Sequence, residues 1–216
     1  ANRAFLRRAV RYCLEDGITQ FLDLGSGIPT VGNVHEVALA ADERARVVYV
    51  DNEPVAVAHT RRLLEGEPRA AMVHADLRDT EAVLGAPEVT ELLDFDRPVA
   101  LLLVAALHYV GADDDPDALL ARYTAALPPG SALVVSQVTM DQRDPDEVAE
   151  ILEIFARTAT PLTMRSRSEI RDLVHCAGWE LVEPGLVWSP EWHPDSPPDA
   201  QWPPAASNSW AGVARR

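Results

Sequence analysis

The sequence of 216 residues predicts an α/β fold built around a mostly parallel sheet. Short apolar segments of strand length alternate with amphipathic segments of helix length, which is typical of right-handed βαβ units. The run RPVALLLVAALHYV at 97–110 is apolar almost throughout, as expected of a central strand buried on both faces. The last two strand-like segments have no helix between them and therefore pair antiparallel or lie at an edge. We expect five parallel strands, a C-terminal antiparallel strand pair and helices on both faces.

The first half of the chain contains three strand-like segments with helices around them. The first helix is expected at 3–16, because its apolar residues recur at helical spacing and Gly17 can end it. Strands and helices then alternate, with strands at 20–27, 45–54 and 69–79, helices at 33–41 and 55–66, and a weaker helix at 80–85.

The second half continues the alternation and then changes pattern. The apolar run at 97–110, which contains a strand, is followed by a helix at 113–127, whose acidic start suits a helix N-terminus. A further helix begins at Ser166 and Glu169, which have capping-box spacing. The other expected elements are a strand at 128–139, a helix at 144–158, a strand at 179–188 with a Pro-Gly break, a strand at 208–216, and between these two strands a proline- and tryptophan-rich loop at 189–207. Trp188, Trp192 and Trp202 flank this loop as either a lid or a cover for the sheet edge.

The charge composition excludes several enzyme classes. All 19 cationic residues are arginine, and the formal net charge is −15. Without a lysine, the chain cannot be a Walker-type phosphate-loop protein, a protein kinase, a lysine aldolase or a pyridoxal-phosphate enzyme with an internal Schiff base. The acidic balance argues against a broad cationic surface for nucleic acid or anionic lipid. We therefore expect neither a nucleic acid nor a membrane as partner.

Length and cysteine content indicate a cytoplasmic chain that forms a single domain over 1–216. Cys13 and Cys176 lie far apart in helical patterns, so free thiols in a reducing compartment are expected. No signal peptide or membrane-spanning segment is visible. The helix at 1–16 is expected to be the remnant of a longer helical segment.

Three expected strands carry an acid at or near their carboxyl ends, where ligands of open α/β sheets bind. These acids are Asp23, Asp51 and Asp76, and Asp23 is followed by the turn Gly25-Ser26-Gly27. The glycines allow close backbone approach to a ligand. An acid at the end of the second strand can bind both hydroxyls of a ribose. The three strand ends together predict a nucleoside pocket.

The glycine pattern distinguishes between nucleoside ligands. A dinucleotide fingerprint has the form G-x-G-x-x-G, but its third position is Thr30 in this chain. The turn is therefore poorly suited to a pyrophosphate. S-adenosylmethionine carries no phosphate, and its ammonium and sulfonium cations suit an acidic pocket.

The ordered motifs of the chain resemble class I S-adenosylmethionine-dependent methyltransferases. More specifically, it resembles the actinobacterial S-adenosyl methyltransferase family formerly listed as a domain of unknown function. The resemblance covers nearly the whole chain and rests on QFLDLGSGIPTVGNVHEVA, ARVVYVDNEPVAVAH, ADLRD, LLDFDRPVALLLVAALHYV, EPGLV and NSWAGVAR. It implies a Rossmann-like methyltransferase sheet, S-adenosylmethionine as cofactor and transfer of its methyl group to an acceptor, which we expect to be a small molecule.

The resemblance also implies roles for individual residues. Asp23 would lie beside the methionine ammonium, directly or through water, and Gly25, Ser26 and Gly27 would contact the amino-acid part. Asp51 would accept hydrogen bonds from the ribose hydroxyls. The adenine would lie among Asn52, Asp76 and Leu77, with Asp76 accepting from its amino group. Val104, Ala105 and His108 would lie near the methyl group and the acceptor.

His108 is the candidate general base, because a histidine can accept a proton near neutral pH. Two alternatives for His108 are a loop hydrogen bond and packing against the cofactor. Methyl transfer is an in-line displacement for which positioning can suffice. No histidine–cysteine pair has metal-ligand spacing, so no metal is expected. Two alternative functions stay open, a catalytically silent S-adenosylmethionine-binding regulator and an NAD-dependent oxidoreductase.

Overall fold

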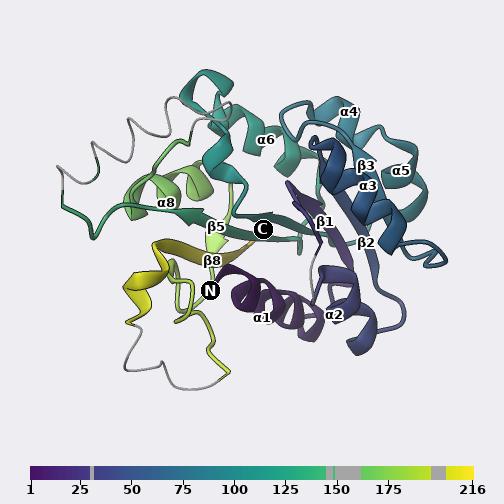
Figure 1. The fold of residues 1–216 in the computed structure, drawn as a ribbon, viewed down its shortest axis with the longest axis horizontal. Helices are drawn as coiled ribbons and strands as arrows, with labels where there is room; N and C mark the ends of the chain where they lie inside the picture. Colours follow the sequence, from purple (N-terminus) through teal and green to yellow (C-terminus); the bar gives the residue numbers. More distant parts are fainter. Residues whose placement is uncertain (30–31, 145–147, 149–161, 196–202) are drawn as a thin grey trace.

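The computed structural model describes residues 1–29, 32–144, 148, 162–195 and 203–216, and it contains a central eight-stranded sheet (Figure 1). Five strands are parallel, in the order β3-β2-β1-β4-β5, and the antiparallel strand β8 adds to β5. The short strands β6 and β7 both pair antiparallel with β8. The bounds are β1 Gln20–Leu24, β2 Arg46–Asp51, β3 Ala70–His74, β4 Ala100–Val104, β5 Ala132–Val138, β6 Glu180–Leu181, β7 Val187–Trp188 and β8 Ser209–Arg215. The predicted five parallel strands and C-terminal antiparallel pairing are confirmed.

Helices cover both faces of this sheet, as predicted. Figure 1 shows α1 and α2 on one side of the sheet and α4 and α6 on the other. Their bounds are α1 Asn2–Glu15, α2 Val34–Ala41, α3 Pro54–Leu63, α4 Thr80–Leu84, α5 Pro87–Leu92, α6 Pro116–Ala126 and α8 Arg167–Cys176, with 3-10 turns η1 Leu107–Tyr109, η2 Ala112–Asp114 and η3 Pro204–Ser207. None of the helices in the described ranges is long and apolar enough to cross a membrane.

Two apolar clusters hold the layers together, one on each face of the sheet. The first contains side chains of α1, α2 and α3, including Phe5, Val34 and Val57. The second contains side chains of α4, α5, α6 and α8. The central strands contribute to both clusters, with Leu22 in one and Phe21 in the other. This burial on both faces explains why the strand sequences are apolar without alternation.

The apolar run at 97–110 contains the expected strand and extends beyond it. β4 ends at Val104, and Ala105 has a positive φ of 58°, which turns the chain into η1. The apolar pattern continues past the strand because Leu107 and Val110 of this turn are also buried. Burial without periodicity does not distinguish a strand from a buried turn.

Three further differences concern short or uncertain segments. The helix α5 was not predicted, because its six residues, which begin with Pro87, are too few to show a helical period. The strand expected at 179–188 has its predicted break at Pro184-Gly185, but the parts on either side, β6 and β7, are only two residues long each. The helix expected at 144–158 falls almost entirely outside the described residues.

The described part of the proline- and tryptophan-rich loop packs on α1 and on the sheet edge. The ring of Trp192 meets that of Phe5 edge-on with centroids 5.4 Å apart. Arg8 donates hydrogen bonds to the carbonyl oxygens of Trp192 and Ser189, each at 2.7 Å. Trp188 stacks on Trp210 of β8 with centroids 3.6 Å apart. These contacts agree with a loop that covers the sheet edge rather than with a lid over a pocket. Trp202 lies outside the described residues.

Candidate functional site

A cavity of about 1180 Å³ opens at the carboxyl ends of β1, β2, β3 and β4. The strand order reverses between β1 and β4, and ligands of doubly wound sheets bind at such a switch point. Nine of the predicted cofactor-binding residues line this cavity, namely Gly25, Ser26, Gly27, Asp51, Asn52, Asp76, Leu77, Val104 and Ala105. The sheet therefore brings together residues that lie up to 80 positions apart, from Gly25 to Ala105.

The turn after β1 is compatible only with glycine at its first position. Gly25 has a φ of +69°, and a Cβ added there would lie 2.7 Å from the Cβ of Ala106. The N–H groups of Gly25 and Ser26 donate to the carbonyl oxygen of Val50 at the end of β2. The turn is thus fixed against two neighbouring strands, and its backbone forms one wall of the cavity.

Asp51 retains hydrogen-bonding capacity on both carboxylate oxygens. Its Oδ2 accepts from the N–H of Gly27 at 2.7 Å, and its Oδ1 accepts from the N–H of Glu53 at 2.9 Å. A carboxylate offers about four acceptor positions, two on each oxygen. The described residues therefore leave one acceptor position on each oxygen of Asp51, and Asp51 lines the cavity.

Asp76 is placed in the same way at the end of β3, but its acceptor positions are filled. Oδ1 accepts from the backbone N–H of Arg78 and from its Nε, both at 2.9 Å. Oδ2 accepts from Arg78 Nη2 at 2.6 Å and from Asn52 Nδ2 at 3.1 Å. The hydrogen bonds from Arg78 lower the pKa of Asp76 to about 2. A ligand amino group therefore has to replace one of these donors, and the Asn52 amide makes the longest of the four bonds.

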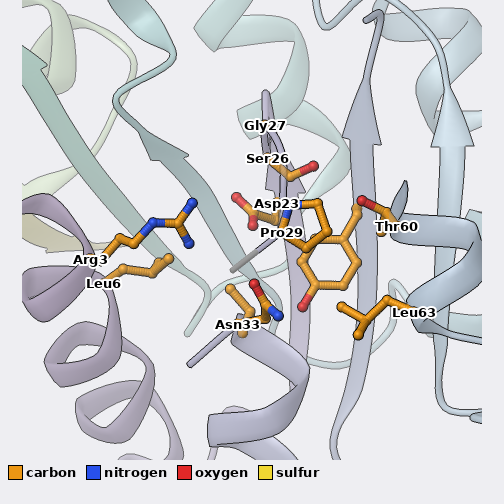
Figure 2. A pocket seen from close by; sticks show the side chains of 11 residues that line it. Arg3, Leu6, Asp23, Ser26, Gly27, Pro29, Asn33, Thr60 and Leu63 are labelled. Carbon is orange, nitrogen blue, oxygen red and sulfur yellow. The ribbon is translucent and has the colours of Figure 1, made fainter. Parts of the chain in front are cut away.

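Asp23 lines a separate small cavity of about 20 Å³ rather than the large one (Figure 2). Arg3, Leu6, Ser26 and Gly27 line both cavities. A volume of this size holds about one water molecule. Burial raises the pKa of the Asp23 carboxyl to about 7, with a further contribution from Asp51, while the positive charge of Arg3 acts in the opposite direction.

His108 does not lie where the sequence places it. It was expected at the mouth of the pocket, but it is 4% exposed in η1, and the neighbouring Tyr109 lines the large cavity instead. Burial, followed by the charge of Arg165, lowers the pKa of His108 to about 4. Its Nδ1 has no hydrogen-bond partner within the described part of the chain. The 3-10 turn after β4 rotates this side chain into the core.

The comparisons with known proteins agree with this geometry. A family model described as S-adenosyl methyltransferase matches residues 1–216. The chain belongs to this family. A crystal structure of a putative methyltransferase from Thermobifida fusca is 40% identical, with a TM-score of 0.91, and the match covers 100% of this chain and 80% of that one. A DUF574 family protein from Streptomyces avermitilis is 38% identical, with a TM-score of 0.88 and coverage of 100% and 82%.

More distant structures share the fold. Human N-acetylserotonin methyltransferase, solved in complex with S-adenosylmethionine, is 16% identical with a TM-score of 0.60, and the match covers 100% of this chain and 51% of that one. None of the curated proteins matches the chain. The protein is an S-adenosylmethionine-dependent methyltransferase, and S-adenosylmethionine is its cofactor.

The residues of the cavity fit this cofactor. The buried Oγ of Ser26 has no hydrogen-bond partner among the described residues, although it borders both cavities. Such an atom is satisfied when a polar ligand group binds beside it. The two acceptor positions left on Asp51 match in number the two hydroxyls of a ribose. Ala105, which lines the cavity, has the strained positive φ of 58° that is common at ligand sites.

Sequence reasoning missed part of the methyltransferase site. Asn2, Arg3 and Leu6 of α1 line the large cavity, as do Tyr109, Arg78, Asp113, Asp114, Leu162 and Thr163. Arg78 follows Asp76 by two positions, so its ion pair could have been found from the sequence ADLRD. No local signal connects α1 to the glycine turn, because that contact depends on the packing of the helix against the sheet.

Proposed function

We propose that the large cavity binds S-adenosylmethionine with its ribose at Asp51, and that the methyl group passes to a small-molecule acceptor. The observation that carries this proposal is the hydrogen bonding of the Asp51 carboxylate. Backbone N–H groups hold its carboxylate in place, one acceptor position is left on each oxygen, and Asp51 lines the cavity. Two hydroxyls on neighbouring ribose carbons match such a pair of acceptors.

The remaining cofactor contacts follow from the position of the ribose. On one side of Asp51, the adenine would lie on Leu77 and beside Asn52, with its amino group replacing the Asn52 amide on Asp76. On the other side, the amino-acid end would lie along Gly25, Ser26 and Gly27. Its ammonium would face Asp23, directly or through the one water that fits the small cavity. Val104 and Ala105 would then border the sulfonium.

When bound, the cofactor would supply a methyl group on a sulfonium centre, and transfer in line would form a bond between the acceptor and the methyl carbon while the carbon–sulfur bond breaks and S-adenosylhomocysteine leaves. The protein contributes to this step by orienting both molecules and by excluding water. Tyr109 lines the cavity beyond Ala105 and is 47% exposed, so its ring is available to an acceptor. His108 packs against this ring with centroids 4.4 Å apart. The geometry supports a role for His108 in holding Tyr109 rather than in accepting a proton.

Two observations favour a small acceptor over a nucleic acid. The cavity of about 1180 Å³ exceeds the range of roughly 300–1000 Å³ for single small-molecule sites, which leaves room for cofactor and acceptor together. Five acidic side chains and two arginines line the cavity, which disfavours a phosphate backbone. The acidic side chains are Asp51, Glu53, Asp76, Asp113 and Asp114.

Titration calorimetry with S-adenosylhomocysteine and with NAD tests the cofactor assignment. We expect S-adenosylhomocysteine to bind and NAD to bind at least tenfold more weakly, because the Thr30 position impairs a pyrophosphate turn. Tighter binding of NAD would contradict the proposal. Transfer of a labelled methyl group from the cofactor into a cell extract then tests the acceptor class. Label in the small-molecule fraction supports the proposal, label in nucleic acid or protein contradicts it, and no transfer favours a silent binding protein.

A further inference from the structure

The side chain of Arg3 reaches the glycine turn from helix α1. Its Nη2 donates a hydrogen bond to the carbonyl oxygen of Ile28 at 3.0 Å. Figure 2 shows its guanidinium directed toward the Asp23 carboxylate, with Ser26 and Gly27 close by. Arg3 lines both the large and the small cavity. The bond to Ile28 uses one of the five N–H donors of a guanidinium, so the group is held in place with donors to spare.

Arg3 also differs from Arg78, the other cation of the cavity, in its ion pairing. Arg78 pairs with Asp76 at 2.6 Å and with Asp114 at 3.3 Å, so its charge is already compensated. Among the ion pairs found in the described ranges, none involves Arg3. The amino-acid end of the cofactor carries a carboxylate, which the acidic lining of the cavity repels. Arg3 is the lining cation that can bind this carboxylate.

We propose that Arg3 binds the cofactor carboxylate while Asp23 binds the neighbouring ammonium. The assignment rests on the proposed function of the cavity. Arg3 and Asp23 both line the small cavity but form no direct ion pair. A zwitterionic amino acid placed at this gap joins the two charges, with each of its groups facing the opposite sign.

Two further observations agree with this arrangement. The orphaned Oγ of Ser26 borders the same two cavities and can donate to the carboxylate beside Arg3. The bond to Ile28 fixes the guanidinium without using a carboxylate, which keeps its planar fork available for a bidentate contact. Helix α1 thus supplies a cofactor contact that the strand ends do not provide.

The proposal predicts a specific kinetic change. The cofactor carboxylate does not take part in methyl transfer, so Arg3 stabilises the bound cofactor equally before and during the reaction. Loss of such uniform binding raises KM for the cofactor and leaves kcat unchanged. A merely structural role in holding the glycine turn lowers both the affinity for every adenosine ligand and kcat.

The test compares two ligands and two matched variants of the full chain. Calorimetry measures the binding of S-adenosylhomocysteine and of 5′-methylthioadenosine, which lacks the amino and carboxylate groups, to the wild type, Arg3→Gln and Arg7→Gln. Arg7 lies one turn further along α1, so its variant removes the same charge from the same helix. We expect Arg3→Gln to weaken S-adenosylhomocysteine roughly 10- to 100-fold, the range of charge-assisted hydrogen bonds. The affinity of Arg3→Gln for 5′-methylthioadenosine should change less than about threefold. The affinity of Arg7→Gln for either ligand should also change less than about threefold.

Each other result overturns the assignment. Equal weakening of both ligands in Arg3→Gln would give Arg3 a structural role only, and unchanged affinity for S-adenosylhomocysteine would remove it from the site. If Arg3→Gln does not fold, Arg3→Lys retains the charge without the fork and should weaken S-adenosylhomocysteine alone, by several-fold. A wild type that binds neither ligand would contradict the proposed function itself, which is distinct from a failure of Arg3.

Discussion

The two ends of the large cavity are built in different ways. The cofactor end lies on the carboxyl ends of β1, β2 and β3, where strand pairing and backbone hydrogen bonds fix Gly25 and Asp51. The proposed acceptor end is formed by the 3-10 turns η1 and η2 and by Leu162 and Thr163. At the first end a carboxylate is held by main-chain donors, whereas at the second an exposed Tyr109 ring forms part of the wall. The difference suggests that changes at the sheet affect folding and cofactor binding together, whereas changes at the acceptor end leave both intact.

Among the substitutions that test this difference between the two ends, replacement of Gly25 is expected to have the largest effect on the free energy of unfolding. Gly25→Ala places a Cβ about 2.7 Å from the Cβ of Ala106 and requires alanine at a φ of +69°. The overlap and the backbone strain together should lower the free energy of unfolding by roughly 2–5 kcal/mol. Gly27→Ala is the matched control, because its φ is also positive but nothing lies within 4 Å of the added Cβ. It should cost only about 1–2 kcal/mol in urea unfolding, and equal losses in the two variants would contradict the close contact with Ala106.

The buried carboxylate of Asp23 is expected to lower the free energy of unfolding while it strengthens cofactor binding. Its pKa of about 7 in the folded protein exceeds the ordinary value of 3.8, so the folded state binds more protons between about pH 4 and pH 7. The free energy of unfolding should therefore fall as pH rises through this window. Asp23→Asn should raise it at pH 8 by about 1–3 kcal/mol, since each unit of pKa shift corresponds to about 1.4 kcal/mol.

Cofactor binding should respond in the opposite sense. The wild type should bind S-adenosylhomocysteine more weakly below pH 7, as the Asp23 carboxylate becomes protonated, and Asp23→Asn should lose this pH dependence. Thermal unfolding and calorimetry across pH 5 to pH 8 measure both quantities. An Asp23→Asn variant that is less stable at pH 8, or that keeps the wild-type pH profile of binding, would show that Asp23 is not the titrating group.

Much of the cofactor end could be predicted from the sequence, because its signals are local. An acid at or near a strand end and a glycine turn are visible in short segments, and parallel pairing then brings Asp51 and Gly27 together. The hydrogen-bonded state of each acid was not visible. Asp51 and Asp76 both lie at or near the carboxyl end of a strand. Only the acceptor positions of Asp76 are filled by the side chains of Arg78 and Asn52.

The acceptor end could not be predicted for a physical reason. Its residues belong to segments that meet only through tertiary packing, such as Tyr109 of η1 and Thr163. The apolar run that ends in LHYV predicts a strand with His108 after it, at the mouth of the pocket. The turn that starts at Ala105 instead places His108 in the core, and Tyr109 lines the cavity.

Replacement of Tyr109 is expected to have the smallest effect on the cofactor end. Tyr109→Ala should change the affinity for S-adenosylhomocysteine less than about twofold, because an exposed side chain away from special contacts contributes little to the fold. The same variant should lower methyl transfer into the small-molecule fraction of an extract several-fold, while Tyr109→Phe, which keeps the ring, should retain most of it. A large loss of S-adenosylhomocysteine affinity in Tyr109→Ala would show that the two ends are not separable.

The most direct test of the account is the affinity of Asp51→Asn for S-adenosylhomocysteine and for its 2′,3′-dideoxy analogue. Glu53→Gln serves as control, because it removes a charge from the same cavity while its side chain can still accept from Ala56 at the start of α3. We predict that Asp51→Asn binds S-adenosylhomocysteine roughly 10- to 100-fold more weakly, as two charge-assisted hydrogen bonds are lost. The dideoxy analogue should bind the wild type and Asp51→Asn equally, and Glu53→Gln should resemble the wild type. Unchanged affinity of Asp51→Asn for S-adenosylhomocysteine, or an equal loss for both ligands, would contradict the placement of the ribose at Asp51.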